Sequence, residues 1–178
     1  MKPVLLTRHS STPSMPMTLP VRFGRTGSLL RVTFRIPGDT FEIRLPDRAP
    51  SEFRDKLWQH TCFEVFVMPR EGPKYMEVNL SPSTEWAAYQ FDDYRDGMRP
   101  ASIEPAKIVS TRPKNRFELS AVIKIPDWAD VPWRVNLTAV IEEKDGRKSY
   151  WALAHPDGPP DFHNRDCFVA HLPSGKAP

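Results

Sequence analysis

Hydrophobic and polar residues alternate along most of this chain with a period of two, which is typical of β-strands. In residues 29–36, for example, every second side chain is apolar, and Arg31, Thr33 and Arg35 lie between them. The same alternation predicts long strands at 61–68, 74–80, 85–91, 116–125 and 133–143, and shorter ones at 40–45, 103–111, 149–153 and 166–172. No segment of helical length shows a 3.6-residue period, so the pattern predicts an all-β protein.

About ten short strands with turn residues between them indicate an antiparallel β-sandwich of two sheets, an immunoglobulin-like or jelly-roll-like fold. The sequence Lys-Asp-Gly-Arg at 144–147 predicts a hairpin, because Asp-Gly is a favoured two-residue turn. The chain has 178 residues, with 20 prolines and only 8 glycines. This length fits one domain, and scattered prolines confine regular structure to short segments. We expect a loose lead-in over 1–20, one sandwich domain over 21–173 and a frayed tail over 174–178.

The central strands have a second face that the alternation separates from the core. We expect this face to bear an aromatic ring beside carboxylates and amides: Glu64, Tyr75, Glu77, Asn79 and Trp86, with Gln90, Asn136 and Thr138 nearby. Such a mixture suits a sugar, because an aromatic ring packs on its C–H face while carboxylates and amides bind its hydroxyls. The solvated face of an antiparallel sheet has the same composition, so this alternative stays open.

Residues 150–166 form a segment dense in aromatic, proline and ionisable residues, which is a functional hint in a predicted loop. Trp151, His155, Asp161 and His163 are its candidate binding residues. Together with Asp166 and His60, the same groups suggest a metal site, although their spacing matches no standard motif. The alternative is a loop that covers one end of the sandwich, with Trp151 and Phe162 as plugs.

Charge and motif content narrow the function classes. The net charge of +3 comes with no dense Lys/Arg block, which disfavours nucleic acid. No GxSxG elbow and no glycine-rich phosphate loop occur. We therefore assign no residue of the predicted site as catalytic or as a metal ligand. Cys62 and Cys167 lack a zinc-ligand spacing, and their pairing stays undecided.

The sequence also bears on location and partners. No apolar run is long enough to span a membrane, and the run at 4–6 is too short for a signal peptide. We therefore expect a soluble, cytoplasmic protein with no membrane partner. Its cofactors and its oligomeric state stay undecided.

Three stretches together resemble a known group of domains: 57–67, 75–89 and 150–168. The first contains Trp-x-x-Thr-x-x-Glu-x-Phe from Trp58, and the second contains Tyr-x-Glu-x-Asn from Tyr75. The set resembles the bacterial DOMON-like domains, which are similar to family-nine carbohydrate-binding modules. This resemblance implies a two-sheet sandwich that binds a sugar or haem without catalysis.

The resemblance also implies particular ligand groups. Sugar-binding relatives use two tryptophans around the sugar, for which Trp86 with Trp58 or Trp151 are the candidates. Haem-binding relatives use a methionine with a lysine or histidine. Met76 is expected to face the core, and Met68 and Met98 have no obvious partner.

Our leading hypothesis is a non-catalytic module that binds a carbohydrate or another small polar ligand. Its predicted ligand-binding residues are Trp58, His60, Glu64, Tyr75, Glu77, Asn79, Trp86, Trp151, His155, Asp161 and His163. The alternatives are a metal-dependent or acid/base enzyme that uses the His/Asp-rich loop, a haem-binding domain, and a structural or interaction domain.

Overall fold

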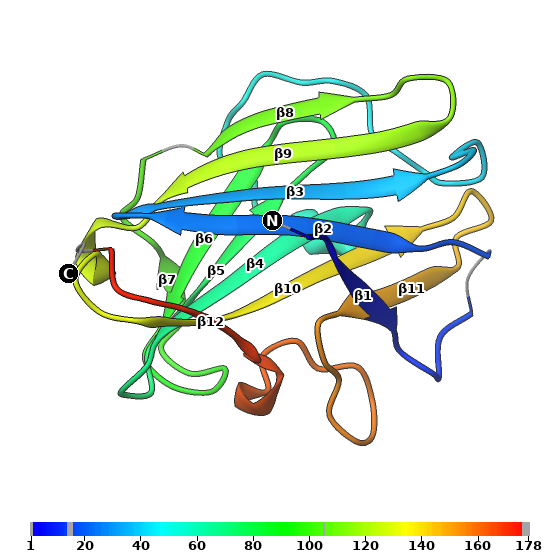
Figure 1. Ribbon diagram of the computed structural model, residues 1–178. Coiled ribbons are helices and arrows are strands. Elements are labelled where there is room, and N and C mark those ends of the chain that lie inside the picture. Colours follow the sequence, from blue (N-terminus) through cyan, green and yellow to red (C-terminus); the bar gives the residue numbers. More distant parts are fainter. Residues whose placement is uncertain (1, 14–15, 105, 176–178) are drawn as a thin grey trace.

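The computed structural model describes residues 2–13, 16–104 and 106–175, and strands dominate it (Figure 1). The strands are β1 (Val4–Arg8), β2 (Leu19–Thr26), β3 (Leu29–Pro37), β4 (Cys62–Pro69), β5 (Tyr75–Leu80), β6 (Trp86–Phe91), β7 (Arg99–Pro100), β8 (Lys107–Thr111), β9 (Arg116–Lys124), β10 (Trp133–Glu142), β11 (Lys148–Ala152) and β12 (Ala170–Leu172). Three single-turn 3₁₀ helices lie between them: η1 (Leu57–Gln59), η2 (Pro126–Trp128) and η3 (Arg165–Cys167). No helix among the described residues is long and apolar enough to cross a membrane.

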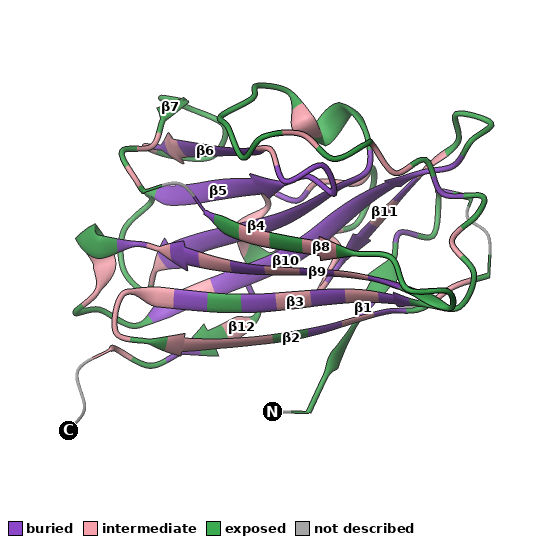
Figure 2. Ribbon diagram, turned by 90° about the horizontal axis from the view of Figure 1, so that it is seen from above, coloured by how far each residue is buried: buried purple, intermediate pink, exposed green. Residues whose placement is uncertain are grey.

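All these strands belong to one continuous antiparallel sheet. The order is β7-β6-β5-β4-β10-β11-β1-β2-β3-β9-β8, and β12 pairs with β10 beside this path. Strand β1 joins two parts of the sheet, since Val4–Leu6 pairs with β2 while Thr7 and Arg8 pair with β11. We call β7, β6, β5, β4, β10 and β11 the β4 half, and β2, β3, β9 and β8 the β3 half. The sheet curls at β1, so that the two halves face one another (Figures 1 and 2).

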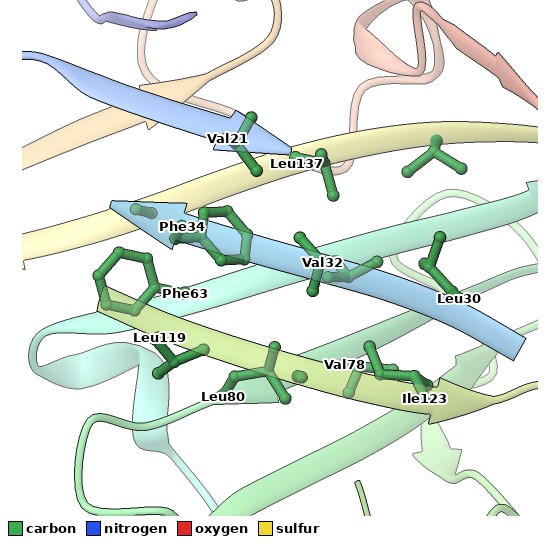
Figure 3. Packing of buried hydrophobic residues seen from close by; sticks show 14 of the residues in the cluster. Val21, Leu30, Val32, Phe34, Phe63, Val78, Leu80, Leu119, Ile123 and Leu137 are labelled. Carbon is green, nitrogen blue, oxygen red and sulfur yellow. The ribbon is translucent and has the colours of Figure 1, made fainter. Parts of the chain in front are cut away.

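The two halves share a hydrophobic core. Phe63 of β4 lies between Phe34 of β3 and Phe117 of β9, with ring centroids 5.0 and 5.6 Å away. Figure 3 shows side chains of both halves, such as Val32 and Val78, pointing into the same layer. Burial of these apolar side chains is the main favourable contribution to folding, and it holds the curled sheet closed.

The strand pattern confirms most of the sequence-based predictions. The all-β antiparallel class is correct, and each long predicted segment contains a strand. Hairpin 144–147 is also correct: Glu143 N donates to Arg147 O at 2.8 Å, and Gly146 has a φ of 88°. The prediction of two separate sheets is not confirmed. Two halves face one another as in a sandwich, but β1 joins them into one sheet.

Three short predicted strands differ from the structure. The strand predicted at 103–111 begins only at Lys107. Residues 40–45 form only one isolated bridge, at Ile43, because Asp39 Oδ1 accepts the Phe41 N–H at 2.9 Å and turns the chain. The prediction for 166–172 is wrong in its first half. There Asn164 Oδ1 accepts the Asp166 N–H at 2.9 Å and starts η3, so the strand begins only at Ala170.

The N-terminal segment also differs from the expectation of a loose lead-in. β1 lies within residues 1–20 and is an interior strand of the sheet. Only Leu6 of its five residues is buried, so the pattern of the sequence does not reveal the strand. Most of the expected tail, 176–178, lies outside the described residues.

Strands β4, β5, β6 and β10 of the β4 half are buried on both of their faces. All six residues of β5 are buried, and Figure 2 shows β5 and β4 as continuous buried strands whereas β3 alternates. One face packs in the shared core. The other, which we call the outer face, forms a second apolar cluster with the loop between β11 and β12: Phe66, Met68, Tyr75, Ala87, Tyr89, Phe91, Val140, Ala152, Phe162 and Phe168. The outer face is therefore a covered surface and not a solvated one.

We expect Phe63→Ala to lower the free energy of unfolding by about 3–5 kcal/mol, because it leaves a cavity between the two halves. Urea denaturation measures this loss. Phe41→Ala is the matched control: Phe41 is 68% exposed, and its loss should stay below about 1 kcal/mol. Equal losses in both variants would contradict the role of Phe63 in the shared core.

Candidate functional site

A cavity of about 390 Å³ lies on the outer face of the β4 half. Its floor is formed by side chains from β4, β5, β6, β10 and β11: Glu64, Phe66, Glu77, Phe91, Val140 and Tyr150. Its walls come from η1, from the β6–β7 loop and from the β11–β12 loop: Trp58, Arg95, Met98, Pro160, Phe162 and His163. The cavity therefore combines aromatic walls with two acidic groups, as small-molecule sites commonly do.

The two acidic groups lie on neighbouring strands. Glu64 pairs with Asn79, and Glu77 pairs with Phe66, so the two carboxyls are diagonal neighbours on one face. Glu64 is only 2% exposed and Glu77 only 5%. Thr138 Oγ1 donates to Glu64 Oε2 at 2.9 Å, and Asn79 Nδ2 donates to Glu77 Oε1 at 2.7 Å. Each carboxyl thus has one hydrogen bond to the sheet.

Burial changes the protonation of this pair. Desolvation raises the pKa of Glu64 well above its ordinary value, and the charge of Glu77 raises it further. Desolvation also raises the pKa of Glu77 to about 7, although the Asn79 hydrogen bond and the charge of Arg95 oppose the shift. Because like charges in a low-dielectric site resist ionisation together, the pair retains a proton near neutral pH.

His163 lies beside the pair as a neutral imidazole. Desolvation by burial, with a contribution from Arg95, lowers the pKa of His163 to about 4. The Tyr75 hydroxyl accepts the Arg95 N–H at 3.1 Å and lies 2.8 Å from His163 Nδ1. In the tautomer in which Tyr75 donates to Nδ1, the neutral ring has its proton on Nε2. That Nε2 is 3.7 Å from Glu77 Oε2, and the low pKa of His163 means that the contact is not an ion pair at neutral pH.

Asp161 connects the two loops that form the walls. Its carboxylate accepts hydrogen bonds from the Tyr94 hydroxyl at 2.8 Å, from Arg95 Nη2 at 2.8 Å and from the His163 N–H at 3.1 Å. These bonds lower the pKa of Asp161 against the opposing effect of burial. Arg95 has a positive φ of 53°, which is uncommon for a residue with a side chain. The bonds to Tyr75 and Asp161 stabilise this conformation.

Aromatic rings line the cavity and its rim. Phe91 stacks on Tyr75 with a centroid distance of 4.6 Å and an interplanar angle of 4°. Its centroid is also 5.2 Å from that of His163. At the rim, Trp58 is 43% exposed and Met98 is 52% exposed. A ligand entering the cavity would therefore cover the exposed apolar surface of these two side chains.

Seven of the predicted binding residues belong to this site. Trp58, Glu64, Glu77 and His163 line the cavity. Tyr75, Asn79 and Asp161 support it, each through a hydrogen bond to one of the residues that line it.

The other four predicted residues lie elsewhere. Trp86 and Trp151 belong to the shared core, where they are 8% and 5% exposed. The placement of Trp86 on the face of Glu64 is wrong, because Tyr89 pairs with Glu77 and so the alternate set of β6 lies on the outer face. Trp58 is thus the tryptophan in the cavity, without Trp86 or Trp151 opposite it.

The histidines of the suggested metal site do not converge. His60 Nδ1 lies 2.7 Å from Glu142 Oε2, in a separate depression, and His155 Nε2 donates to Thr7 O at 2.8 Å. Within the described ranges, no group of three or more His, Cys, Asp or Glu side chains is placed to hold a metal ion. The two cysteines are buried and free.

The methionines considered for haem are also located. Met76 lies in the shared core, as its alternation predicts, and Met68 lies in the outer cluster. Met98 lines the cavity together with His163.

Sequence reasoning missed several residues of the cavity as binding residues: Phe66, Phe91, Arg95, Met98, Val140, Tyr150, Pro160 and Phe162. Phe66, Phe91 and Val140 follow the strand alternation and are indistinguishable from core residues. Arg95 lies in the sequence Asp-Asp-Tyr-Arg-Asp-Gly at 92–97, whose density of charges in a turn was the one available signal.

No protein-family model matches the chain, and no curated protein matches it. The DOMON-like resemblance therefore stays a prediction. Among solved structures, the chain is similar to a putative carbohydrate-binding protein from Bacteroides uniformis ATCC 8492. The TM-score is 0.67 at 17% identity, over 97% of this chain and 85% of that one.

The chain is also similar to a carbohydrate-binding module of family 9 from Caldicellulosiruptor kristjanssonii. The complex of that module with glucose gives a TM-score of 0.55 at 8% identity, over 93% of this chain and 81% of that one. The complex with cellotriose gives 0.57 at 9% identity, over 99% and 84%. The chain thus shares the fold of carbohydrate-binding modules.

The buried position of Glu77 predicts a pH effect on stability. Its pKa is about 7 in the folded protein against an ordinary value of 4.5, so its contribution is present below about pH 4.5 and is lost as the pH rises towards 7. His163, lowered from 6.5 to about 4, acts in the opposite direction: its contribution is present above about pH 6.5 and is lost on acidification. The two effects offset each other in the unchanged protein.

The Glu77→Gln variant removes the pH effect of Glu77 and keeps that of His163. Relative to the unchanged protein, the free energy of unfolding of this variant should rise by up to about 1.4 kcal/mol per pH unit between about pH 5 and 7. Urea denaturation across this range measures the difference. Glu118→Gln on β9, outside the cavity, is the matched control. A flat difference for Glu77→Gln, or the same rise in Glu118→Gln, would contradict the assignment.

Proposed function

We propose that this protein is a non-catalytic ligand-binding module that holds a carbohydrate in the cavity over Glu64 and Glu77. The observation that supports this most directly is the composition of the cavity. Two buried carboxyls form part of its floor, and an exposed tryptophan stands at its rim. Its volume of about 390 Å³ falls in the range of small-molecule sites.

The chemistry of a sugar matches these groups. Sugar hydroxyls both donate and accept hydrogen bonds, and the carboxyls of Glu64 and Glu77 and the Nε2–H of His163 offer partners of both kinds. The apolar C–H face of the sugar ring would pack on the indole of Trp58. Burial of both carboxyls excludes competing water, which strengthens each of these hydrogen bonds.

The comparisons favour the same role. The solved structures that share the fold include a family-nine module in complex with glucose and in complex with cellotriose. We also propose that the protein is related to the DOMON-like domains. In this proposal the two facing halves of the curled sheet correspond to the two sheets of a sandwich. The proposed site does not place two tryptophans around the sugar. Trp58 lines the cavity, whereas Trp86 and Trp151 lie in the shared core.

Trp58→Ala tests the site. We expect the variant to bind glucose or cellotriose at least about tenfold more weakly, a loss of about 1.4 kcal/mol, because it removes the ring on which the sugar packs. Isothermal titration measures the affinity. Phe41→Ala removes an exposed ring outside the cavity and should leave binding unchanged. If the protein bound no sugar of a glycan array, or if Trp58→Ala bound as tightly as the unchanged protein, the proposal would be wrong.

A further inference from the structure

We propose that the cavity prefers a ligand with a positively charged amino group, such as an amino sugar, over the neutral sugar of the same shape. This inference rests on the proposed function and names the ligand class of the same site. It depends on how the two buried carboxyls are surrounded, which the next paragraphs describe.

The first step is a census of the ionisable and charged groups around Glu64 and Glu77. The groups that interact electrostatically with the pair are Cys62 (β4), Tyr75 (β5), Tyr89 (β6) and Arg95 (β6–β7 loop). His163 (β11–β12 loop) lies 3.7 Å from Glu77, and Asp161 of the same loop interacts with Tyr75 and His163. Arg95 is the only permanent cation of this set within the described part of the chain, and its Nη2 bonds to Asp161 Oδ1 at 2.8 Å. Arg95 and Asp161 therefore balance each other, and the two glutamates have no full counter-charge.

The second step concerns hydrogen bonds. Thr138 and Asn79 each bond to one oxygen of Glu64 and Glu77, respectively. In the part of the chain that the structure describes, Glu64 Oε1 and Glu77 Oε2 accept no hydrogen bond, and His163 Nε2 lies 3.7 Å from Glu77 Oε2, beyond hydrogen-bond distance. Both carboxyls line the cavity although they are 2% and 5% exposed. Neither oxygen is among the fully buried atoms without a partner in the described residues, so both can be reached from the cavity, and a ligand that supplies donors can bind them.

An ammonium group suits these two carboxyl oxygens better than a hydroxyl does. It has three donors and no acceptor, so it can bond to both free oxygens at once. Charge-assisted hydrogen bonds are about twice as strong as neutral ones. A hydroxyl supplies one donor and leaves the second oxygen without a partner.

The protonation of the pair gives the binding a measurable signature. The pKa of Glu77 is raised to about 7, and that of Glu64 is also raised. Near pH 6.5 the pair therefore holds protons that a bound ammonium would replace. Binding of an amine should release about one proton, whereas binding of a neutral sugar should release none.

Isothermal titration at pH 6.5 with glucosamine, glucose and N-acetylglucosamine tests the inference on the full chain. We expect glucosamine to bind at least tenfold more tightly than glucose, and the N-acetyl form, whose nitrogen is neutral, to lose this advantage. Titration in two buffers of different ionisation enthalpy measures the proton release. Cyclohexylamine and cyclohexanol repeat the comparison of amine with alcohol on a ring that is not a sugar.

Glu77→Gln and Glu64→Gln should each reduce the preference for glucosamine to about threefold or less, and Glu118→Gln on β9 should keep it. The comparison of ligands on the unchanged protein needs no variant, so it stands even if a buried substitution prevents folding. Glucose binding as tightly as glucosamine would overturn the inference and leave the proposed function intact. A preference for cyclohexylamine without binding of any sugar would support the charge selection and overturn the carbohydrate. Binding of none of the five ligands would overturn the inference, and the absence of binding on the glycan array as well would overturn the proposed function.

Discussion

The structure depends on one constraint: the central strands of the β4 half are buried on both of their faces. Most antiparallel sheets leave one face in water, and their strands then alternate between apolar and polar residues. In β4, β5 and β10 the residues of both faces are buried, so a second layer has to cover the outer face. The loop between β11 and β12 supplies that layer with Phe162 and Phe168. Because a loop fills the layer less completely than a third sheet would, it leaves the cavity, and Glu64 and Glu77 lie in it.

Much of the fold follows from the period of two. Where one face meets water, as in β3, alternation identifies the strand and also its core side: Leu30, Val32, Phe34 and Ile36 are all buried. The same reasoning located the strands of the β4 half but could not tell their two faces apart. In β6 both alternate sets contain aromatic residues, and Gln90 is in the set of Trp86, so Trp86 was assigned to the wrong face. β1 escaped notice for the opposite reason, since it buries only Leu6 and its stability comes from backbone pairing with two neighbours.

The candidate site could be predicted as far as its polar groups. Glu64 and Glu77 were recognisable because the alternation places them on the face away from the core, and His163 because it lies in a loop dense in ionisable and aromatic residues. The aromatic part was not recognisable, since a ring that lines a cavity and a ring that fills a core obey the same pattern. Arg95 was hidden for another reason: its role depends on Asp161, 66 residues away in the sequence. Only folding brings the β6–β7 loop and the β11–β12 loop together, and the bond between Arg95 and Asp161 then holds the cavity wall in place.

The position of β1 also has a consequence for how the protein is made. β1 is synthesised before the other strands of this sheet, yet its residues Thr7 and Arg8 pair with Ala152 and Trp151. The β3 half needs β9 to be complete, and the closure of the sheet needs β11. The strands from β2 to β11 must therefore all be synthesised before β1 finds both of its partners. Until then one edge of β1 is open to other chains, so the nascent sheet is prone to aggregation until β11 has been made.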